Sequence, residues 1–319
     1  MQQTQNIKKA FSLLEVIFVI VILGIVASIG SSVIVKVYES YIMQRSIHNA
    51  SIKTELAINQ LANRLVYRIN TSVVARRPGQ LGNASPGDII PLNQVGPANA
   101  NTHTILEWIG YDNDGFTTQN PPVWNGFTDL DASDFNQVTS TGSILNNEIA
   151  LLNNLFPNLV SPALIFSGLD YRQDNLTGTI FSYSANCMYN TAGNGCIFPV
   201  NLLGVNLTFA GGGNRNAGDM IYTEFYKLAA SAYAVVPNNA HQVTQDGANV
   251  WDLNLHFDYQ PWENENYLSN QNNQSTLLRN VSVFRFTQEQ NSVRLKICVI
   301  EAIGINTEIS ICKEKAVIR

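Results

Sequence analysis

The sequence predicts an α+β fold in which one long N-terminal helix packs on an antiparallel β-sheet head with loop-rich insertions. Two observations support this class. From about Phe11 to about Val74 the apolar residues are first continuous and then helically spaced, and no proline occurs before Pro78. After Gly79 short alternating runs are separated by turn residues, which is typical of antiparallel strands.

The first half of the expected helix has the composition of a membrane span. Residues 16–35 contain no charged side chain, and about 20 apolar residues suffice to cross a hydrocarbon core. We therefore expect residues 11–35 to form a single transmembrane helix in contact with the lipid bilayer. Lys8 and Lys9 precede it, which favours a cytoplasmic N-terminus and an exported remainder.

Two simpler interpretations of this segment fit less well. A secretory signal peptide would have a shorter apolar stretch and a small-residue cleavage site, whereas here a polar helical pattern continues through Lys36 and Glu39. An uncleaved anchor leaves Glu15 unexplained, because a carboxylate at the edge of a membrane helix is costly and commonly functional.

The residues around Glu15 resemble a known processing signal. Lys8-Lys9-Ala10 followed by Phe11-Ser-Leu-Leu-Glu15-Val-Ile-Phe-Val-Ile-Val-Ile-Leu-Gly is similar to the class III signal of type IV pilins and type II secretion pseudopilins. The resemblance implies that residues 1–10 are a leader, which a prepilin peptidase removes between Ala10 and Phe11 before methylating the new amine. It also implies assembly with other pilins or pseudopilins on an inner-membrane platform.

The same resemblance gives Glu15 a role in assembly. It implies that the carboxylate pairs with the Phe11 amine of a neighbouring subunit, and a buried charge is tolerable when it has such a partner. The chain departs from the family at Ala10, where Gly is usual, and at Ser32, where many members carry Pro.

The second half of the helix, residues 36–78, is expected to lie outside the membrane on the head. Ile58, Leu61 and Leu65 recur at helical spacing and would form the stripe that packs there.

The remaining residues, 79–319, are expected to form the β-rich head. Its expected strands are 105–109, 205–209, 251–259, 281–286 and 293–299, with a short helix over 144–155. We expect the regions 80–140 and 185–245 to be loop-rich insertions or a second lobe.

Four cysteines indicate an oxidising compartment if they are paired. Local pairing gives Cys187–Cys196 and Cys298–Cys312, and the second pair flanks a turn at residues 304–306. Closing a loop of about 15 residues stabilises by about 3 kcal/mol in the chain-entropy account. Four unpaired structural thiols remain the alternative.

Composition and motifs argue against several functions. The chain of 319 residues carries 19 Lys and Arg against 24 Asp and Glu, which disfavours a general nucleic-acid binder. No constellation of nucleophile, base and metal ligands indicates an enzyme. His256 and Asp258 share a strand face and could chelate a metal together, but a solvated strand face is the favoured interpretation.

Calcium is the one cofactor that the sequence suggests. Asp112-Asn-Asp114-Gly115 resembles the middle of an EF-hand loop, although Gly110 and Pro121 stand where the first and twelfth ligands belong. Some pseudopilins bind calcium, so the resemblance to that family supports a possible calcium site at Asp112 and Asp114. A second acidic cluster follows at residues 129–134.

The favoured function is therefore a structural one. We expect a minor pilin or pseudopilin, anchored in a bacterial inner membrane with a periplasmic head, and assembled into a periplasmic or surface filament for type II secretion or pilus biogenesis. The alternatives are a filament-borne adhesin or DNA-uptake receptor and, remotely, a membrane-anchored periplasmic enzyme. Arginines at 64, 68, 76 and 77, and basic residues at 294, 296, 313 and 315, are interpreted as surface solvation rather than a nucleic-acid site.

Overall fold

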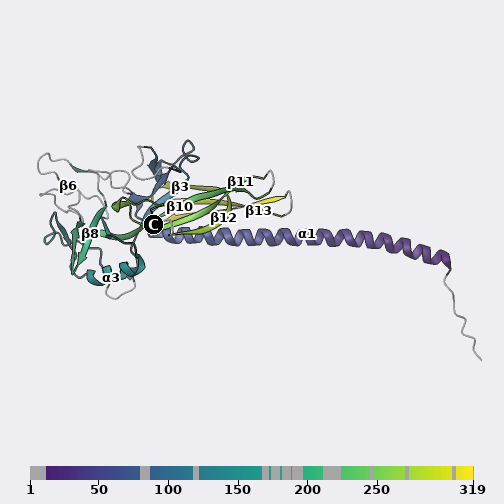
Figure 1. The fold of residues 1–319 in the computed structure, drawn as a ribbon, viewed down its shortest axis with the longest axis horizontal. Helices are drawn as coiled ribbons and strands as arrows, with labels where there is room; N and C mark the ends of the chain where they lie inside the picture. Colours follow the sequence, from purple (N-terminus) through teal and green to yellow (C-terminus); the bar gives the residue numbers. More distant parts are fainter. Residues whose placement is uncertain are drawn as a thin grey trace, which may run out of the picture.

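The computed structural model describes residues 12–79, 87–117, 122–166, 172–173, 180–181, 188, 197–210, 224–244, 247–269, 273–303 and 307–318. Within them the expected α+β class is confirmed, because one long helix leads into a β-rich head (Figure 1). The helices are α1 (Leu13–Val66), α2 (Asp114–Thr117) and α3 (Leu145–Leu155), with 3-10 turns η1 (Asn70–Ser72), η2 (Leu92–Gln94) and η4 (Pro261–Glu263). The strands are β1 (Val74–Arg76), β2 (Ile89–Pro91), β3 (Ile105–Tyr111), β4 (Gln137–Thr139), β5 (Ala163–Phe166), β6 (Arg172–Gln173), β7 (Ile180–Phe181), β8 (Phe198–Leu203), β9 (Asn206–Phe209), β10 (Tyr226–Gln242), β11 (Asn249–Tyr259), β12 (Gln274–Glu289), β13 (Ser292–Ala302) and β14 (Glu308–Ile318).

Helix α1 has 54 residues and is therefore about 80 Å long at about 1.5 Å per residue. Its buried residues all lie toward its C-terminal end, between Ala50 and Leu65. The preceding part projects away from the head as a single rod (Figure 1). An 18-residue window within α1 has a mean hydropathy of 2.8 and no buried residues, so the helix is long and apolar enough to cross a membrane.

The helix ends at Val66, about eight residues before the expected end near Val74 and well short of residue 78. The chain instead makes the 3-10 turn η1 and enters β1, which pairs with β3. Ser72 at the end of η1 accepts a hydrogen bond from the Ile109 amide at 2.9 Å through its hydroxyl. Tertiary pairing with β3 therefore overrides the helical pattern of this segment.

One antiparallel sheet organises the head, in the order β14-β13-β12-β11-β10-β5-β8-β9-β4. Strand β10 is its centre, because it pairs with β5 at its start and with β3 and β11 further along. The expected strands correspond to β3, β9, β11, β12 and β13, and the expected helix is α3. The region 185–245 is not a mere insertion, since it supplies β8, β9 and the central strand β10.

Two packed regions determine where surfaces are available. The second half of α1 packs on β12, β13 and β14, with Leu61 and Leu65 in one core with Phe284, Leu295 and Ile297. Helix α3 covers strand β8 at the end of the head away from the projecting helix (Figure 1). We call the described residues 122–166 and 197–210, which contain α3, β4, β5, β8 and β9, the distal lobe.

Candidate functional site

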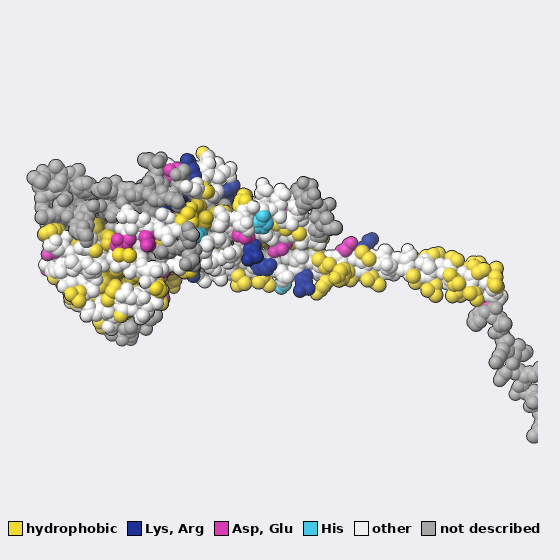
Figure 2. All heavy atoms as spheres, viewed as in Figure 1, with side chains coloured by type: hydrophobic (Ala, Val, Ile, Leu, Met, Phe, Trp, Pro, Cys, Tyr) yellow, Lys and Arg dark blue, Asp and Glu magenta, His cyan; other side chains and the backbone are white. Residues whose placement is uncertain are grey.

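The projecting part of α1 is an uncovered apolar surface. Between residues 13 and 37 its large apolar side chains are between 47% (Val16) and 80% (Leu13) exposed. Figure 2 shows them as hydrophobic stretches along the rod, separated by a stretch of other surface. A monomeric soluble protein rarely exposes apolar surface of this extent, and such a surface is typical of membrane insertion or of contact with another protein.

The first turn of this helix is organised by Ser12 and Glu15. The Ser12 hydroxyl accepts a hydrogen bond from the Glu15 amide at 3.3 Å, and the Glu15 carboxylate accepts one from the Ser12 amide at 3.4 Å. This reciprocal capping box begins the helix two residues after Phe11. Ala10 and Phe11 lie outside the described residues, so cleavage of the peptide bond between them stays a prediction. The pairing of Glu15 with the Phe11 amine of a neighbouring subunit also stays a prediction.

Residues 5–31 match the family model for the prokaryotic N-terminal methylation motif. This methylation motif spans the basic residues, the expected cleavage position and the first half of the apolar helix. Together with α1 it is consistent with a type IV pilin-like protein, in agreement with the resemblance described above. No match was found among the curated proteins or among the solved structures. The similarity to type IV pilin-like proteins therefore rests on the methylation motif and the helix that continues it.

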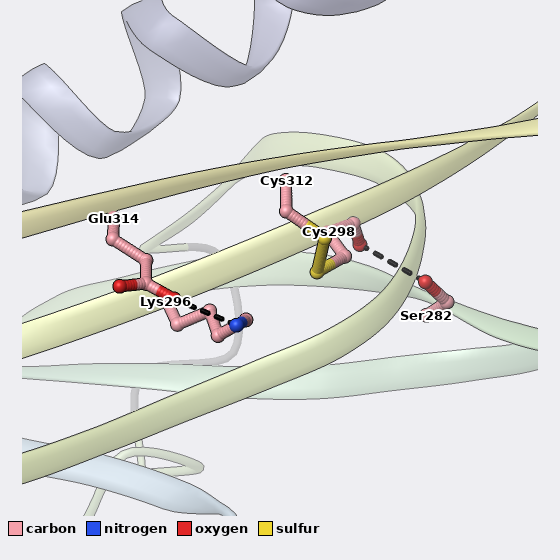
Figure 3. The surroundings of a disulfide bond; sticks show 5 residues. All are labelled: Ser282, Lys296, Cys298, Cys312 and Glu314. Carbon is pink, nitrogen blue, oxygen red and sulfur yellow. Dashed lines mark hydrogen bonds and ion pairs between the residues drawn. A yellow bond between two sulfur atoms is a disulfide. The ribbon is translucent and has the colours of Figure 1, made fainter.

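The disulfide expected near the C-terminus is present in the head. Cys298 on β13 lies directly opposite Cys312 on β14, with a Cα–Cα distance of 4.0 Å, and a bond joins their sulfur atoms (Figure 3). Beside it Lys296 and Glu314 form an ion pair at 2.6 Å, also between the two strands. This ion pair lowers the pKa of Glu314. Cys187 and Cys196 lie outside the described residues, so their pairing stays a prediction.

The basic residues singled out in the sequence do not all lie on one surface. Arg68 and Arg76, expected near Arg64 on the surface, are fully buried. On β14, Lys313 pairs with Glu55 of α1 at 3.5 Å and Lys315 donates a hydrogen bond to Asn59 of α1. Lys296 instead lies beside Glu314, on the opposite face of the sheet. This separation argues against a continuous phosphate-binding face.

His256 and Asp258 are buried, which corrects the expected solvated strand face. Asp258 has a φ of 56° and accepts hydrogen bonds from the side chains of Asn158 and Asn273 at 3.2 and 2.9 Å. Burial raises the pKa of Asp258 and lowers that of His256, whose ring packs edge-on against Tyr267 at 5.4 Å. The two residues therefore serve the packing of this end of β11.

The acidic turn at Asp112 is a capping structure. One carboxylate oxygen of Asp112 accepts a hydrogen bond from the Asp114 amide at 3.2 Å. The other accepts from the Gly115 amide at 3.0 Å and from the Trp124 indole at 2.8 Å. Asp112 is buried and Asp114 is exposed, so the two carboxylates face different surroundings.

Sequence reasoning missed a third acid at this turn, Glu148 of α3. It is fully buried, and burial together with the charge of Asp112 raises its pKa to about 9. The signal was available, because Glu148 lies on the same face of the short helix as the buried Leu145 and Leu152. A carboxylate in the apolar stripe of an amphipathic helix needs an explanation.

Within the described residues, no three acidic, histidine or cysteine side chains converge in a way that could hold a metal ion. In the second acidic cluster, Asp129 caps the Ala132 amide at 3.2 Å, and Asp134 caps the amides of Asn136 and Gln137 at 2.7 and 2.9 Å. Calcium binding at Asp112 and Asp114 therefore stays a prediction, with a capping role visible for Asp112.

Proposed function

We propose that the chain is a structural subunit of a type IV filament, a minor pilin or pseudopilin acting in type II secretion or pilus biogenesis. A prepilin peptidase would cut between Ala10 and Phe11 and methylate Phe11, after which α1 would enter the filament. The observation that carries the proposal is the methylation motif at residues 5–31, continued by an apolar helix that the head leaves uncovered. Before assembly the lipid bilayer would cover this surface, and afterwards neighbouring helices would.

The expected topology follows from the charges and the disulfide. Lys8 and Lys9 favour a cytoplasmic N-terminus, and a head carrying the Cys298–Cys312 bond suits an oxidising compartment such as the periplasm. An inner-membrane assembly platform and other pilins or pseudopilins are the partners that this topology requires.

Glu15 would act as the contact that sets the stagger between subunits. Its carboxylate caps only its own helix in the isolated chain and is exposed. In a filament it would meet the methylated amine of Phe11 on a neighbour, and the low dielectric there makes an unpaired carboxylate costly. Pairing would therefore favour one register of packed helices over the others.

Mass spectrometry of the mature N-terminus tests the processing step. We expect the chain to begin with N-methyl-Phe11, and an intact Met1 or cleavage after residue 35 would refute the filament proposal. Assembly is tested separately by comparing Glu15→Ala with Glu39→Ala, a matched control on the exposed part of the same helix. Glu15→Ala should be processed normally but should lose cross-linking to neighbouring subunits, whereas Glu39→Ala should keep both.

A filament-borne adhesin is the second candidate, and exposed apolar side chains in the distal lobe and next to it supply the observation that favours it. Phe127 and Phe225 are 53% and 48% exposed with ring centroids 5.0 Å apart, and Leu203 is 70% exposed. Apolar side chains on the part of the head farthest from the membrane helix suit recognition of another molecule better than phosphate binding does. A Phe127→Ser and Phe225→Ser variant that keeps assembly but loses attachment would support this role.

A further inference from the structure

A groove in the head is lined by amide groups around a tryptophan side chain. Its volume is about 480 Å³, within the usual range of about 300–1,000 Å³ for small-ligand sites. Segments far apart in the sequence line it, namely the loop before β3, the β10–β11 hairpin and strand β12. The side chains with polar atoms include Asn101, Asn238, Asn239, Trp251 and Arg285.

The three asparagine amides are each held at one end. The Asn101 Oδ1 atom accepts a hydrogen bond from Arg285, and the Asn238 Oδ1 atom accepts one from the Asn239 backbone amide at 2.8 Å. The Asn239 Nδ2 atom donates to Asp252 at 3.0 Å. The opposite ends of these amides form no hydrogen bond with a described residue. The oriented amides therefore leave two N–H donor groups and one carbonyl acceptor for another molecule.

Trp251 gives the groove an aromatic surface. The chain has four tryptophans, and Trp108, Trp124 and Trp262 are buried, whereas Trp251 is partly exposed. An indole ring offers a large apolar face together with one N–H donor. Beside the amides, it suits a ligand that has both an apolar face and hydrogen-bonding groups.

The strands that carry these side chains are irregular at the groove. The register of β10 on β11 shifts between Asn238 and His241, and that of β11 on β12 shifts between Trp251 and Leu253. Asn239 has a φ of 53°, in the left-handed region. Bulges redirect side chains and are common beside functional sites. Regular pairing is therefore interrupted at the positions that carry two of the amides and the indole.

We propose that this groove binds a neutral oligosaccharide, with Trp251 stacked on a sugar ring and the three asparagine amides hydrogen-bonded to its hydroxyl groups. A sugar ring presents an apolar C–H face and a rim of hydroxyls, each of which both donates and accepts hydrogen bonds. That combination matches an indole beside oriented amide donors and an acceptor. The site is a property of the head and does not depend on the proposed filament function.

The charge of the groove argues against ionic ligands. Among its described lining residues none is acidic, and Arg285 is the one that carries a charge. The Arg285 guanidinium already donates hydrogen bonds to the Ala100 carbonyl at 3.0 Å and to Asn101. A metal ion would find no carboxylate ligand here, and a phosphate group would find a single arginine that is already hydrogen-bonded.

A wholly apolar ligand also fits this groove less well than a sugar does. It would cover the outer ends of the amides without supplying hydrogen bonds, and burial of an unpaired polar group costs free energy. The hydroxyl groups of a sugar would restore the hydrogen bonds that the amides lose to water. The neutral polar ligand is therefore the one that satisfies both the indole and the amides.

Isothermal titration calorimetry of the full-length chain tests the site. The protein is kept in micelles of a zwitterionic detergent, because a detergent with a sugar headgroup would compete. Maltotriose, cellotriose and chitotriose are titrated separately up to millimolar concentrations, and we expect at least one of them to bind. The double variant Asn101→Ala, Asn238→Ala should bind that sugar about tenfold more weakly, because two of the amide donors are lost.

The double variant Asn153→Ala, Asn154→Ala is the matched control, since it removes two exposed amides of α3, which does not line the groove. It should bind the sugar like the wild type. Tryptophan fluorescence gives a second measurement. The sugar should change the emission of the wild type but not that of Trp251→Phe, because the other three tryptophans are buried.

The absence of heat and of a fluorescence change with all three trisaccharides would overturn the proposal. Equal affinity of the wild type and the Asn101→Ala, Asn238→Ala variant would do the same, as would an equal fluorescence change in the wild type and Trp251→Phe. If the double variant loses the circular dichroism of the wild type, the comparison with Trp251→Phe decides. None of these results bears on the filament proposal, which is tested at Phe11 and Glu15.

Discussion

Replacing Cys298 and Cys312 by alanine should lower the melting temperature of the head by about 6–12 °C. The bond closes a loop between positions 14 apart in the sequence, and such a loop of about 15 residues is worth about 3 kcal/mol in the chain-entropy account. For domains of about 150–250 residues, about 1 kcal/mol corresponds to about 2–4 °C. The two cysteines lie opposite each other in the β13–β14 ladder, so the bond joins residues that are already neighbours in the sheet.

The assay is thermal unfolding of the full-length chain in detergent, followed by near-ultraviolet circular dichroism with and without reductant. Reductant should lower the wild-type melting temperature toward that of the double alanine variant. Any further fall that reductant causes in the variant itself reports on Cys187 and Cys196. Without the bond, β14 should open before the rest of the sheet. Hydrogen exchange should therefore be faster over residues 308–318 than over β11.

Two results would refute this reasoning. If the double alanine variant melts within about 2 °C of the wild type, loop closure contributes far less than the entropy account requires. If peptide mapping without reduction finds free thiols at Cys298 and Cys312, the bond does not exist in the mature protein.

Three further predictions concern buried charge. Arg68→Met removes the side chain that donates hydrogen bonds to the carbonyls of residues 65, 291 and 317, so it should lower the free energy of unfolding by about 3–5 kcal/mol in urea titrations. As a control, Arg77→Met at an exposed position should change this free energy by under about 1 kcal/mol. Glu107→Gln removes the carboxylate that lies 3.0 Å from the buried Arg76 guanidinium, so it should lower the free energy of unfolding by about 3–5 kcal/mol. The double variant Arg76→Met, Glu107→Leu removes both charges and should recover most of this loss; an equal loss in the single and double variants would contradict the prediction. Burial lowers the pKa of His256, so the unfolded chain binds its proton more readily and stability should fall as the pH drops below about 6.5; His256→Gln should melt at more nearly equal temperatures at pH 7 and 5.

The parts of the fold that sequence could predict are those with a strong local signal. The uncharged run after Glu15 predicts the membrane-grade helix without any tertiary information, and the alternation in residues 251–259 predicts β11. The cysteines at 298 and 312 lie symmetrically about the sequence expected to turn at residues 304–306, which is enough to predict that they face each other, as β13 and β14 confirm. In each case a few neighbouring residues determine the outcome.

Other features depend on distant partners and could not be predicted in this way. Helix α1 ends at Val66 because the following residues pair with β3, more than thirty residues later in the chain. The central strand β10 is rich in alanine, which has a low β-propensity, and its position follows from three neighbouring strands rather than from its own residues. The meeting of Asp112 and Glu148 likewise requires knowing where α3 docks.

The contacts between α1 and β14 link the disulfide to the orientation of the head. The packed part of the helix lies on β14, where Lys313 pairs with Glu55 and Lys315 contacts Asn59, so this strand helps to fix how the head sits on the helix. Among the described strands, β14 is also the last of the sheet order and pairs with β13 alone. The Cys298–Cys312 bond is a covalent attachment between these two strands. If α1 sets the position of the subunit in a filament, then oxidation of this pair also helps to set the direction in which the distal lobe points.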